Sequence, residues 1–251
     1  FYKIDVRDKK NIAKIIEDCD GVFHEAALTA VPESFEKPQE YHDVNVIGTK
    51  NIFEIAEREN IRVVYASSSS IYGDTKNIPI KESTDRKPIN PYGQTKLDNE
   101  YLVKQYSKIG VKIIGLRYFN IFGKGQTLEY AGVITKFLDR IKQNKAPIIF
   151  GDGSQIRDFI FVEDIAVANL LAMESKIENL LVNIGSGKPI TILELANIMI
   201  KFSKLKLKPI FKSSLDGDIQ KSQADIALAN ENFNWKPKKM VTEWLEETLK
   251  I

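Results

Sequence analysis

The sequence has little cysteine, no long apolar run and almost no net charge. The single cysteine, Cys19, excludes an internal disulfide framework and is typical of a reducing compartment. No apolar stretch reaches the roughly 18 residues that a membrane-spanning helix needs, and no signal peptide is recognisable. The formal charge of +2 gives no strong attraction to nucleic acid or to a membrane surface. We therefore expect a cytoplasmic protein without a nucleic-acid or membrane partner.

Histidine is scarce as well, and several kinds of site are missing. His24 and His42 have no partners at metal-ligand spacing, so we expect structural roles for both and no bound metal. No cysteine–histidine pair suited to nucleophilic catalysis is present, and there is no P-loop.

Segments rich in β-forming residues alternate with helical patterns along the chain. The expected strands are residues 2–6, 21–26, 62–68, 111–118, 147–152 and 180–185, and the expected helices are residues 8–19, 38–59, 91–109, 131–143, 163–174 and 191–202. The strands read as unbroken apolar runs, which indicates burial on both faces. The sequence therefore predicts an α/β fold, with a Rossmann-like, doubly wound parallel sheet that binds ligands at the carboxyl ends of its strands.

Two motifs lie where chemistry is expected in such a sheet. Ser67–Ser70 end an apolar strand, and the stretch NPYGQTK, Asn90–Lys96, follows. Pro91 fits the first turn of a helix, which places Tyr92 and Lys96 on one helix face. Taken singly, the serines are also explained as a strand exit that caps its own backbone, and Tyr92 and Lys96 as surface residues.

Together, these motifs make an acid–base site. A free phenol has a pKa near 10, so a general base near neutral pH requires a decrease of about three units, or about 4 kcal/mol. A neighbouring ammonium supplies part of that stabilisation, and a serine hydroxyl holds the substrate oxygen for proton transfer. We therefore predict Ser68, Tyr92 and Lys96 as the catalytic residues.

The Ser…Tyr-x-x-x-Lys pattern resembles the short-chain dehydrogenase/reductase superfamily. Further motifs in the same order resemble its extended branch, the NAD-dependent epimerase/dehydratase family, and most closely the UDP-glucose and UDP-N-acetylglucosamine 4-epimerases. These motifs are residues 22–56, 116–126, 151–166, 182–187 and 217–225. The resemblance covers essentially the whole chain.

The resemblance implies NAD as cofactor and assigns residues to it. Asp5 and Val6 would meet the adenine, Ala26 and Ala27 would allow close approach of the backbone, and Tyr118 with Phe119 would border the nicotinamide. A strand-end cap and core aromatics are the alternatives for Asp5 and for the aromatic pair. The full predicted cofactor set is Asp5, Val6, Ala26, Ala27, Thr29, Asn45, Ser67, Tyr92, Lys96, Tyr118 and Phe119.

A UDP-sugar is the substrate that the resemblance implies. Arg157 would bind the diphosphate, because its planar fork matches phosphate oxygens. Ser222 would lie beside the C2 substituent of the sugar, and this small residue leaves room for an N-acetyl group. The full predicted substrate set is Ser68, Ser70, Tyr92, Asn120, Phe150, Arg157, Asp218 and Ser222.

The choice of reaction rests on the serine segment. The dehydratases and decarboxylases of the family carry a carboxylate there, whereas residues 67–72 contain none. This favours C4 epimerisation through a 4-keto intermediate. A sugar-nucleotide dehydratase or reductase, or a non-catalytic dinucleotide-binding regulator, remains the alternative.

The sequence departs from the family pattern in two places. The glycine-rich fingerprint and the acid that distinguishes NAD from NADP are absent, so we expect residues upstream of Phe1 and assign the function to the full-length protein. Leu215 stands where an arginine is usual, with Lys212 nearby. We expect a dinucleotide-binding domain over residues 1–120, lacking its first βαβ portion and completed by a strand near 180–185. A substrate-binding part over residues 121–251 and a homodimer through helices 38–59 and 91–109 are also expected.

Overall fold

A parallel sheet organises the larger region of the molecule. The computed structural model describes residues 1–126, 132–214 and 218–250. The four strands are parallel in the order β1-β2-β3-β7, with bounds Gly21–His24, Arg62–Ser68, Ile113–Tyr118 and Leu180–Ile184. The predicted α/β fold with a parallel sheet is confirmed, and the carboxyl ends of the strands meet at one edge.

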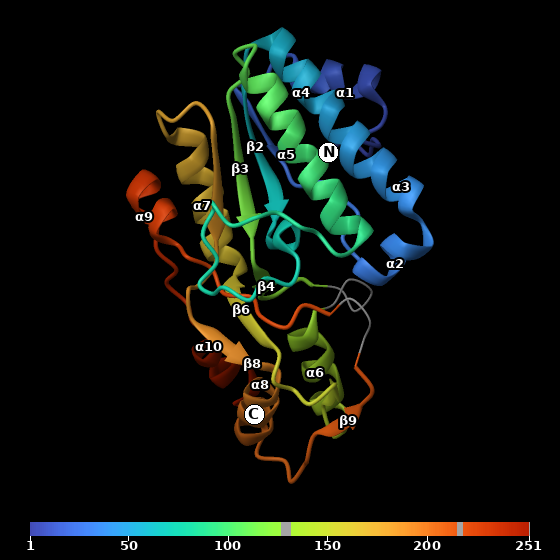
Figure 1. Ribbon diagram of the computed structural model, residues 1–251, viewed down its shortest axis with the longest axis vertical. Coiled ribbons are helices and arrows are strands. Elements are labelled where there is room, and N and C mark those ends of the chain that lie inside the picture. The colour runs from blue at the N-terminus through green and yellow to red at the C-terminus, as the bar shows by residue number, and fades with distance from the viewer. Residues whose placement is uncertain (127–131, 215–217, 251) are drawn as a thin grey trace.

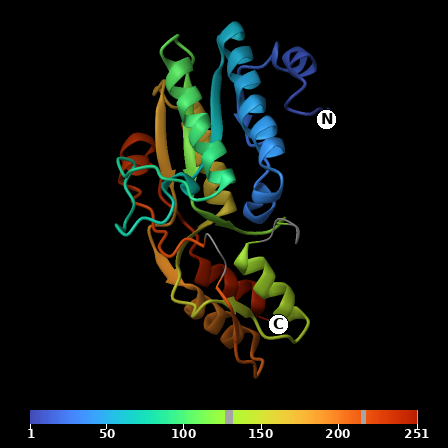
Figure 2. The same cartoon turned by 45° about the vertical axis from the view of Figure 1, so that its right-hand side comes forward.

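Helices cover both faces of this sheet. α4 (Gly48–Glu59) and α5 (Pro91–Ser107) pack on one face, and α7 (Val162–Glu174) packs on the other (Figures 1 and 2). The helix expected over residues 38–59 runs as α3 (Pro38–His42), a π-helical turn η1 (Asp43–Ile47) and α4. The remaining helices near the N-terminus are α1 (Lys9–Ile16) and α2 (Val31–Glu36).

A smaller region lies beyond the carboxyl edge of the sheet, in the lower half of Figure 1. α6 (Val133–Lys142), α8 (Ile192–Ser203) and α10 (Val241–Leu249) enclose an apolar core with Phe137, Leu195 and Trp244. β4 (Asn120–Phe122), β6 (Ile156–Phe161) and β8 (Pro189–Thr191) form one small sheet. β5 (Ile148–Phe150) pairs with β9 (Ile210–Lys212), and α9 (Ala227–Phe233) packs against β7.

One extended segment links the two regions. Ser222 donates its backbone N–H to Ile156 of β6 at 3.0 Å. On the other side of the segment, Ile80 donates its N–H to the Gln223 carbonyl at 2.7 Å, and its carbonyl accepts the Asp225 N–H at 2.9 Å. Residues 218–226 are therefore held from both sides.

The expected strand over residues 2–6 is wrong. Residues 1–5 are irregular, and Val6 and Arg7 form a turn. A strand needs a neighbour for its backbone groups, and no described strand pairs with this segment. Instead, Val6 packs against the start of α4, where a Cβ on Gly48 would lie only 2.6 Å from the Val6 Cγ2 atom.

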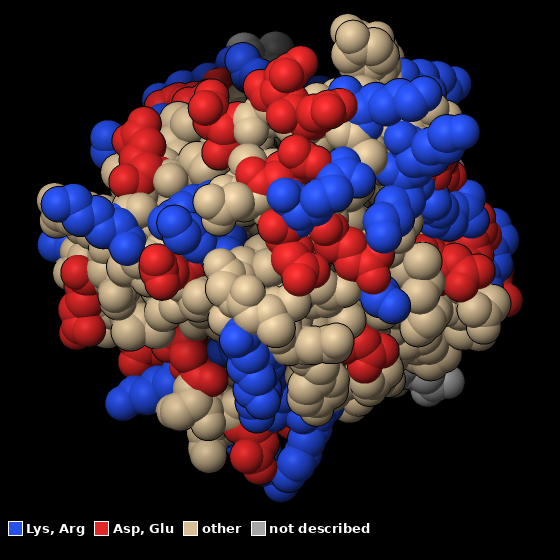
Figure 3. Space-filling view, turned by 90° about the horizontal axis from the view of Figure 1, so that it is seen from above, with Lys and Arg blue, Asp and Glu red and all other residues tan. Residues whose placement is uncertain are grey.

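The described surface is mixed in charge. Figure 3 shows Lys and Arg interspersed with Asp and Glu over the upper face of the molecule. Within residues 1–126, 132–214 and 218–250, no helix is both long and apolar enough to cross a bilayer.

Candidate active site

The start of α5 places Tyr92 against the serine segment. Asn90 caps the helix, since its Oδ1 accepts the Gly93 N–H at 2.7 Å, and Pro91 occupies the first turn. A Cβ on Gly93 would lie 2.8 Å from the Ser70 carbonyl oxygen. The absence of a side chain at Gly93 therefore lets the helix end approach the serine turn closely.

The serines divide between two environments. Ser68 ends β2 and caps the 3-10 turn η2 (Ser69–Tyr72), because its Oγ accepts the Ser70 N–H at 3.2 Å. The Ser68 and Ser70 hydroxyls lie 3.1 Å apart. Ser67 points to the opposite face of the strand and donates to Glu100 at 3.0 Å. Ser68 and Ser70 are thus grouped at the sheet edge, and the Ser67 side chain is not with them.

Lys96 lies beside Tyr92, one helical turn further along α5. Its Nζ is 5.9 Å from the centre of the Tyr92 ring and donates to the Ala66 carbonyl at 2.8 Å. The lysine is only 4% exposed, and this burial lowers its pKa to about 8, with the charge of Glu25 acting in the opposite direction. The ammonium form is therefore present below about pH 8 and is lost as the pH rises through that value.

The pKa of Tyr92 moves against the expectation from the sequence. Burial raises it, and a polar contact with Ser68 acts in the opposite direction. In this structure the neighbouring ammonium does not offset the desolvation of the phenolate. The sequence reasoning was wrong on this point, because it counted the charge of Lys96 and not the burial of the ring.

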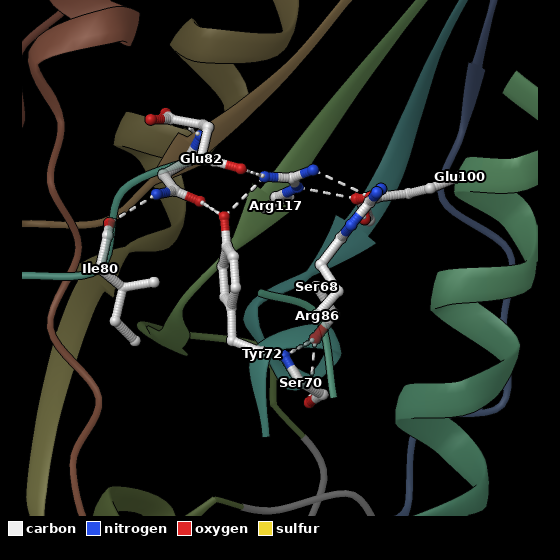
Figure 4. A network of polar contacts seen from close by, with 10 residues as sticks. Ser68, Ser70, Tyr72, Ile80, Glu82, Arg86, Glu100 and Arg117 are labelled. Atoms are coloured by element: carbon white, nitrogen blue, oxygen red, sulfur yellow. Dashed lines mark hydrogen bonds and ion pairs between the residues drawn. The ribbon is translucent and has the colours of Figure 1, made fainter. Parts of the chain in front are cut away.

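Behind the site, a buried ion pair fixes β3 to α5 (Figure 4). Arg117 donates through Nε and Nη2 to the two carboxylate oxygens of Glu100, at 2.7 and 2.9 Å. Arg117 Nη1 also donates to the Tyr72 hydroxyl at 2.6 Å, which donates in turn to Asn183 Oδ1 at 2.7 Å. This network joins η2, α5, β3 and β7, so it holds the serine turn and the Tyr92 helix together.

The sequence analysis missed this network, although one signal was present. Arg117 lies within the apolar run Val111–Tyr118, and a charge inside a buried strand requires a partner. A cavity of about 590 Å³ adjoins the network, with Glu82, Arg86 and Arg117 in its lining. Ser68, Tyr92 and Lys96 do not line this cavity, so it is separate from the candidate site.

The predicted diphosphate ligand lies across from the sheet edge. Arg157 of β6 donates through Nη2 to Asp218 Oδ1 at 2.5 Å and through Nη1 to the Ile156 carbonyl. The Arg157 and Asp218 side chains are 13% and 25% exposed, so the pair remains accessible. Leu215 and Gly217 lie outside the described residues.

The other predicted substrate residues come from β5, from β4 and from the segment that follows Asp218. Phe150 is 38% exposed at the end of β5, and its strand partner in the parallel register is Lys212, whose side chain shares the same face. Asn120 donates to the Asp158 carbonyl at 3.3 Å. Ser222 is buried, with 5% exposure. Contacts of these residues with a substrate stay predictions.

Comparison with known proteins identifies the relatives of this chain. The family model described as the NAD dependent epimerase/dehydratase family matches residues 1–185. The chain belongs to this family. The predicted resemblance is therefore confirmed, and the predicted cofactor, NAD, is the cofactor of this family.

Solved structures of the family superpose closely on the chain. The UDP-N-acetylglucosamine 4-epimerase of Methanobrevibacter ruminantium, in complex with UDP-N-acetylmuramic acid, is 37% identical with a TM-score of 0.93, over 99% of this chain and 81% of that one. The UDP-glucose 4-epimerase of Thermotoga maritima, with UDP-glucose, is 31% identical with a TM-score of 0.95, over 100% and 83%. The UDP-glucose 4-epimerase of Brucella ovis, in complex with NAD, is 28% identical with a TM-score of 0.92, over 100% and 83%.

The residues present at the sheet edge fit a dinucleotide. Ala26 and Thr29 are exposed after β1. Lys96 makes one hydrogen bond among the described residues and keeps donors for an incoming hydroxyl. Asn45, in the π-helical turn, accepts the Leu28 N–H at 2.8 Å and so fixes the segment after β1. When bound, NAD would accept and return a hydride and add a positive charge that favours the Tyr92 phenolate.

Three predicted cofactor residues make contacts within the protein: Asp5 is exposed but paired, and Tyr118 and Phe119 are buried. Asp5 pairs with Arg7 at 2.7 Å, and this hydrogen bond lowers the pKa of Asp5 to about 2. Phe119 is buried in a core cluster, and Tyr118 is mostly buried with its hydroxyl bonded to Glu25. Their roles toward the cofactor, like that of Val6, stay predictions.

The two histidines have structural surroundings. His24 is buried, its Nε2 lies 2.9 Å from Thr49 Oγ1, and burial lowers its pKa to about 3. His42 lies at the end of α3 and is 3.7 Å from the Asp43 carboxylate. Among the described side chains, no group of three His, Cys, Asp or Glu residues is placed to hold a metal ion.

Proposed function

We propose that the protein catalyses the NAD-dependent epimerisation at C4 of a UDP-hexose, with UDP-glucose and UDP-galactose as one pair of substrates. The grouping of Ser68, Tyr92 and Lys96 at the carboxyl edge of the parallel sheet supports this most directly. The absence of a carboxylate from residues 67–72 favours epimerisation over dehydration.

Each residue of the site has a chemical role in this reaction. Ser68 holds the C4 oxygen, and Tyr92 accepts the proton of the C4 hydroxyl as hydrogen leaves C4 as hydride, which bound NAD would accept. Lys96 favours the phenolate by its charge. The resulting 4-keto sugar turns in the site, with its nucleotide held by Arg157 and Asn120. The hydride then returns to the opposite face of C4, and Tyr92 returns the proton to the C4 oxygen.

N-acetylated sugars belong to the proposed substrate range. Ser222 is small, and its N–H donates to the carbonyl of Ile156, the residue before Arg157, so its side chain would take little of the space beside a bound sugar ring. The similarity to a UDP-N-acetylglucosamine 4-epimerase at 37% identity agrees with this range.

The organisation of the protein is part of the proposal. A dinucleotide-binding domain over residues 1–120, completed by β7, acts with a substrate-binding part over residues 121–251. A homodimer through helices α3–α4 and α5 and a cytoplasmic location are predictions from the family resemblance and from composition.

Product analysis tests the proposed function. The purified protein is incubated with NAD and either UDP-glucose or UDP-N-acetylglucosamine, and the products are followed by proton NMR. We expect both substrates to equilibrate with their C4 epimers. A 4-keto-6-deoxy product would favour a dehydratase, and binding of NAD without turnover of either sugar would favour a non-catalytic regulator.

A further inference from the structure

A buried carboxylate, that of Asp158, lies between the two regions of the molecule and has no role so far. It belongs to β6, next to Arg157, and is 0% exposed. Its Oδ1 accepts the Ser186 N–H at 2.7 Å and the Ser186 hydroxyl at 2.6 Å. Its Oδ2 accepts the N–H groups of Gly187 and Ala224, each at 2.9 Å. Four donors from two segments far apart in the sequence therefore meet on one side chain.

The number of donors requires a carboxylate at this position. Two carboxylate oxygens offer about four acceptor sites, whereas a side-chain amide offers a single oxygen and brings N–H donors of its own. Burial raises the pKa of Asp158, and the hydrogen bonds from Ser186, Ala224 and Gly187 act in the opposite direction. Hydrogen bonds to an ionised acceptor are short and strong, in agreement with distances of 2.6 to 2.9 Å. An amide in place of the carboxylate could therefore satisfy only about half of these donors.

Ser186 and Gly187 place the carboxylate at the edge of the parallel sheet. They follow β7, which ends at Ile184, next to the end of β3. The chain passes so close here that a Cβ on Gly185 would lie 3.0 Å from Asp158 Oδ2. β6 is thus attached to the edge of the sheet that carries the candidate catalytic residues.

Ala224 brings the linking segment 218–226 to the same carboxylate. At the start of this segment, Asp218 pairs with Arg157, the neighbour of Asp158 in β6. The segment is therefore attached to two successive residues of β6, through an accessible ion pair and through a buried carboxylate. Loss of the buried contact would free the segment, and with it one partner of the ion pair that is proposed to meet the diphosphate.

We propose that Asp158 is a positioning residue for the UDP-sugar, because its carboxylate fixes the linking segment to β6 and both of them to the end of β7. A substrate held at Arg157 then keeps its place relative to Tyr92 across the boundary between the two regions. The effect on substrate binding rests on the proposed function, whereas the anchoring of the segment does not. A purely structural role would lower the fraction of folded protein, and hence kcat, but it would leave KM unchanged.

Binding of UDP alone tests the inference without turnover. We expect Asp158→Asn to raise the Kd of UDP about tenfold in isothermal titration calorimetry, because buried donors of the segment lose a charged acceptor. KM for UDP-glucose should rise by the same factor, with a smaller change in kcat. Asp164→Asn is the matched control, since Asp164 of α7 is another buried carboxylate that accepts backbone N–H groups, those of Lys238 and Lys239. This control should keep the parent Kd and KM.

Amide hydrogen exchange, measured by NMR, shows whether the segment itself is released. In Asp158→Asn the Gly187 and Ala224 amides should exchange faster than in the parent protein, whereas Asp164→Asn should leave their exchange unchanged. Ser186→Ala removes the hydroxyl donor and keeps the carboxylate, so it serves even where Asp158→Asn fails to fold. It should raise the Kd of UDP about threefold, the smaller effect of losing one hydrogen bond.

The outcomes separate the inference from the proposed function. Parent values of the UDP Kd in both Asp158→Asn and Ser186→Ala would overturn the inference, and so would unchanged exchange of the Ala224 amide. An equal rise of Kd in Asp164→Asn would overturn it as well, because the loss would then follow stability alone. Faster exchange and weaker UDP binding in a protein that epimerises no sugar would support the inference and contradict the proposed function.

Discussion

Arg117 and Arg157 both pair with a carboxylate, but their surroundings differ. Arg117 binds Glu100 inside the parallel-sheet region, with side chains 3% and 0% exposed. Arg157 binds Asp218 beside the smaller region, with side chains 13% and 25% exposed. All three nitrogens of the Arg117 guanidinium are engaged, whereas Arg157 Nε has no partner among the described residues. The first pair can hold the protein together, and the second can also meet an anionic ligand.

The different burial of the two arginine pairs reflects different tasks of the two regions, one fixing the candidate catalytic residues and the other offering groups to a ligand. The sheet region fixes Ser68, Tyr92 and Lys96 through caps, a close glycine contact and a buried ion pair. The smaller region offers accessible groups on short strands and on the linking segment 218–226. Substitutions in the sheet region should therefore lower kcat or stability, and those in the smaller region should change KM and substrate choice.

Tyr92→Phe should have the largest effect. Removing the phenol oxygen removes the proton acceptor, and general acid–base catalysis contributes about 10²–10⁴-fold to a rate. We expect kcat to fall by that factor, with KM for UDP-glucose nearly unchanged, in a steady-state assay. Tyr101→Phe alters an exposed ring of the same helix and should keep parent activity. Turnover of Tyr92→Phe within a few-fold of the parent would exclude Tyr92 as the base.

Glu100→Gln tests the buried ion pair of Arg117 and Glu100. Glutamine keeps the shape of the side chain but leaves the Arg117 charge buried without compensation, which costs about 3–5 kcal/mol of unfolding free energy. Urea unfolding at pH 7 measures the loss. Glu54→Gln, which removes the more exposed pair with Lys9, should cost less than about 1 kcal/mol. Equal losses of unfolding free energy in Glu100→Gln and Glu54→Gln would remove the distinction between the buried pair and the more exposed one.

Arg157→Lys tests the accessible ion pair of Arg157 and Asp218. An ammonium cannot bind a diphosphate through two parallel hydrogen bonds, so we expect KM for UDP-glucose to rise about 10–100-fold while kcat changes little. Initial rates over a range of substrate concentrations give both constants. Lys142→Ala, at an exposed position of α6, is the matched control. A lower kcat at unchanged KM would place Arg157 in the chemical step instead of in nucleotide binding.

Ser222→Tyr should have the smallest effect, confined to substrate choice. The large ring would fill the space proposed for an N-acetyl group, so the ratio of kcat/KM for UDP-N-acetylglucosamine to that for UDP-glucose should fall about tenfold. Ser222→Ala should keep the parent ratio. An unchanged ratio in Ser222→Tyr would show that the acetyl group lies elsewhere.

The parts of the site that are local in sequence could be predicted. Pro91 and Asn90 mark the start of α5, and the apolar run before Ser68 marks a strand end, so Tyr92 and Ser68 could be placed at the sheet edge. The family followed from the order of several motifs and is confirmed by the match over residues 1–185.

The remaining parts depend on contacts between distant residues. Glu100 and Arg117 come from different elements, and no periodicity pairs them. β6 was missed because Arg157 and Asp158 interrupt its apolar pattern. Asp158 is buried, and its carboxylate accepts hydrogen bonds from the N–H groups of Ser186, Gly187 and Ala224 and from the Ser186 hydroxyl. Burial of Tyr92, which reverses the expected shift of its pKa, is likewise a property of the folded chain.

Isotope tracing in heavy water tests the central assignment most directly. The protein is incubated with NAD and UDP-glucose in D₂O, and the product is examined by NMR and mass spectrometry. If hydrogen leaves C4 as hydride and returns to the same carbon while Tyr92 moves only the hydroxyl proton, UDP-galactose forms with no deuterium on carbon. Deuterium at C5 in a dehydrated product, or at C4 in UDP-galactose, would contradict this assignment.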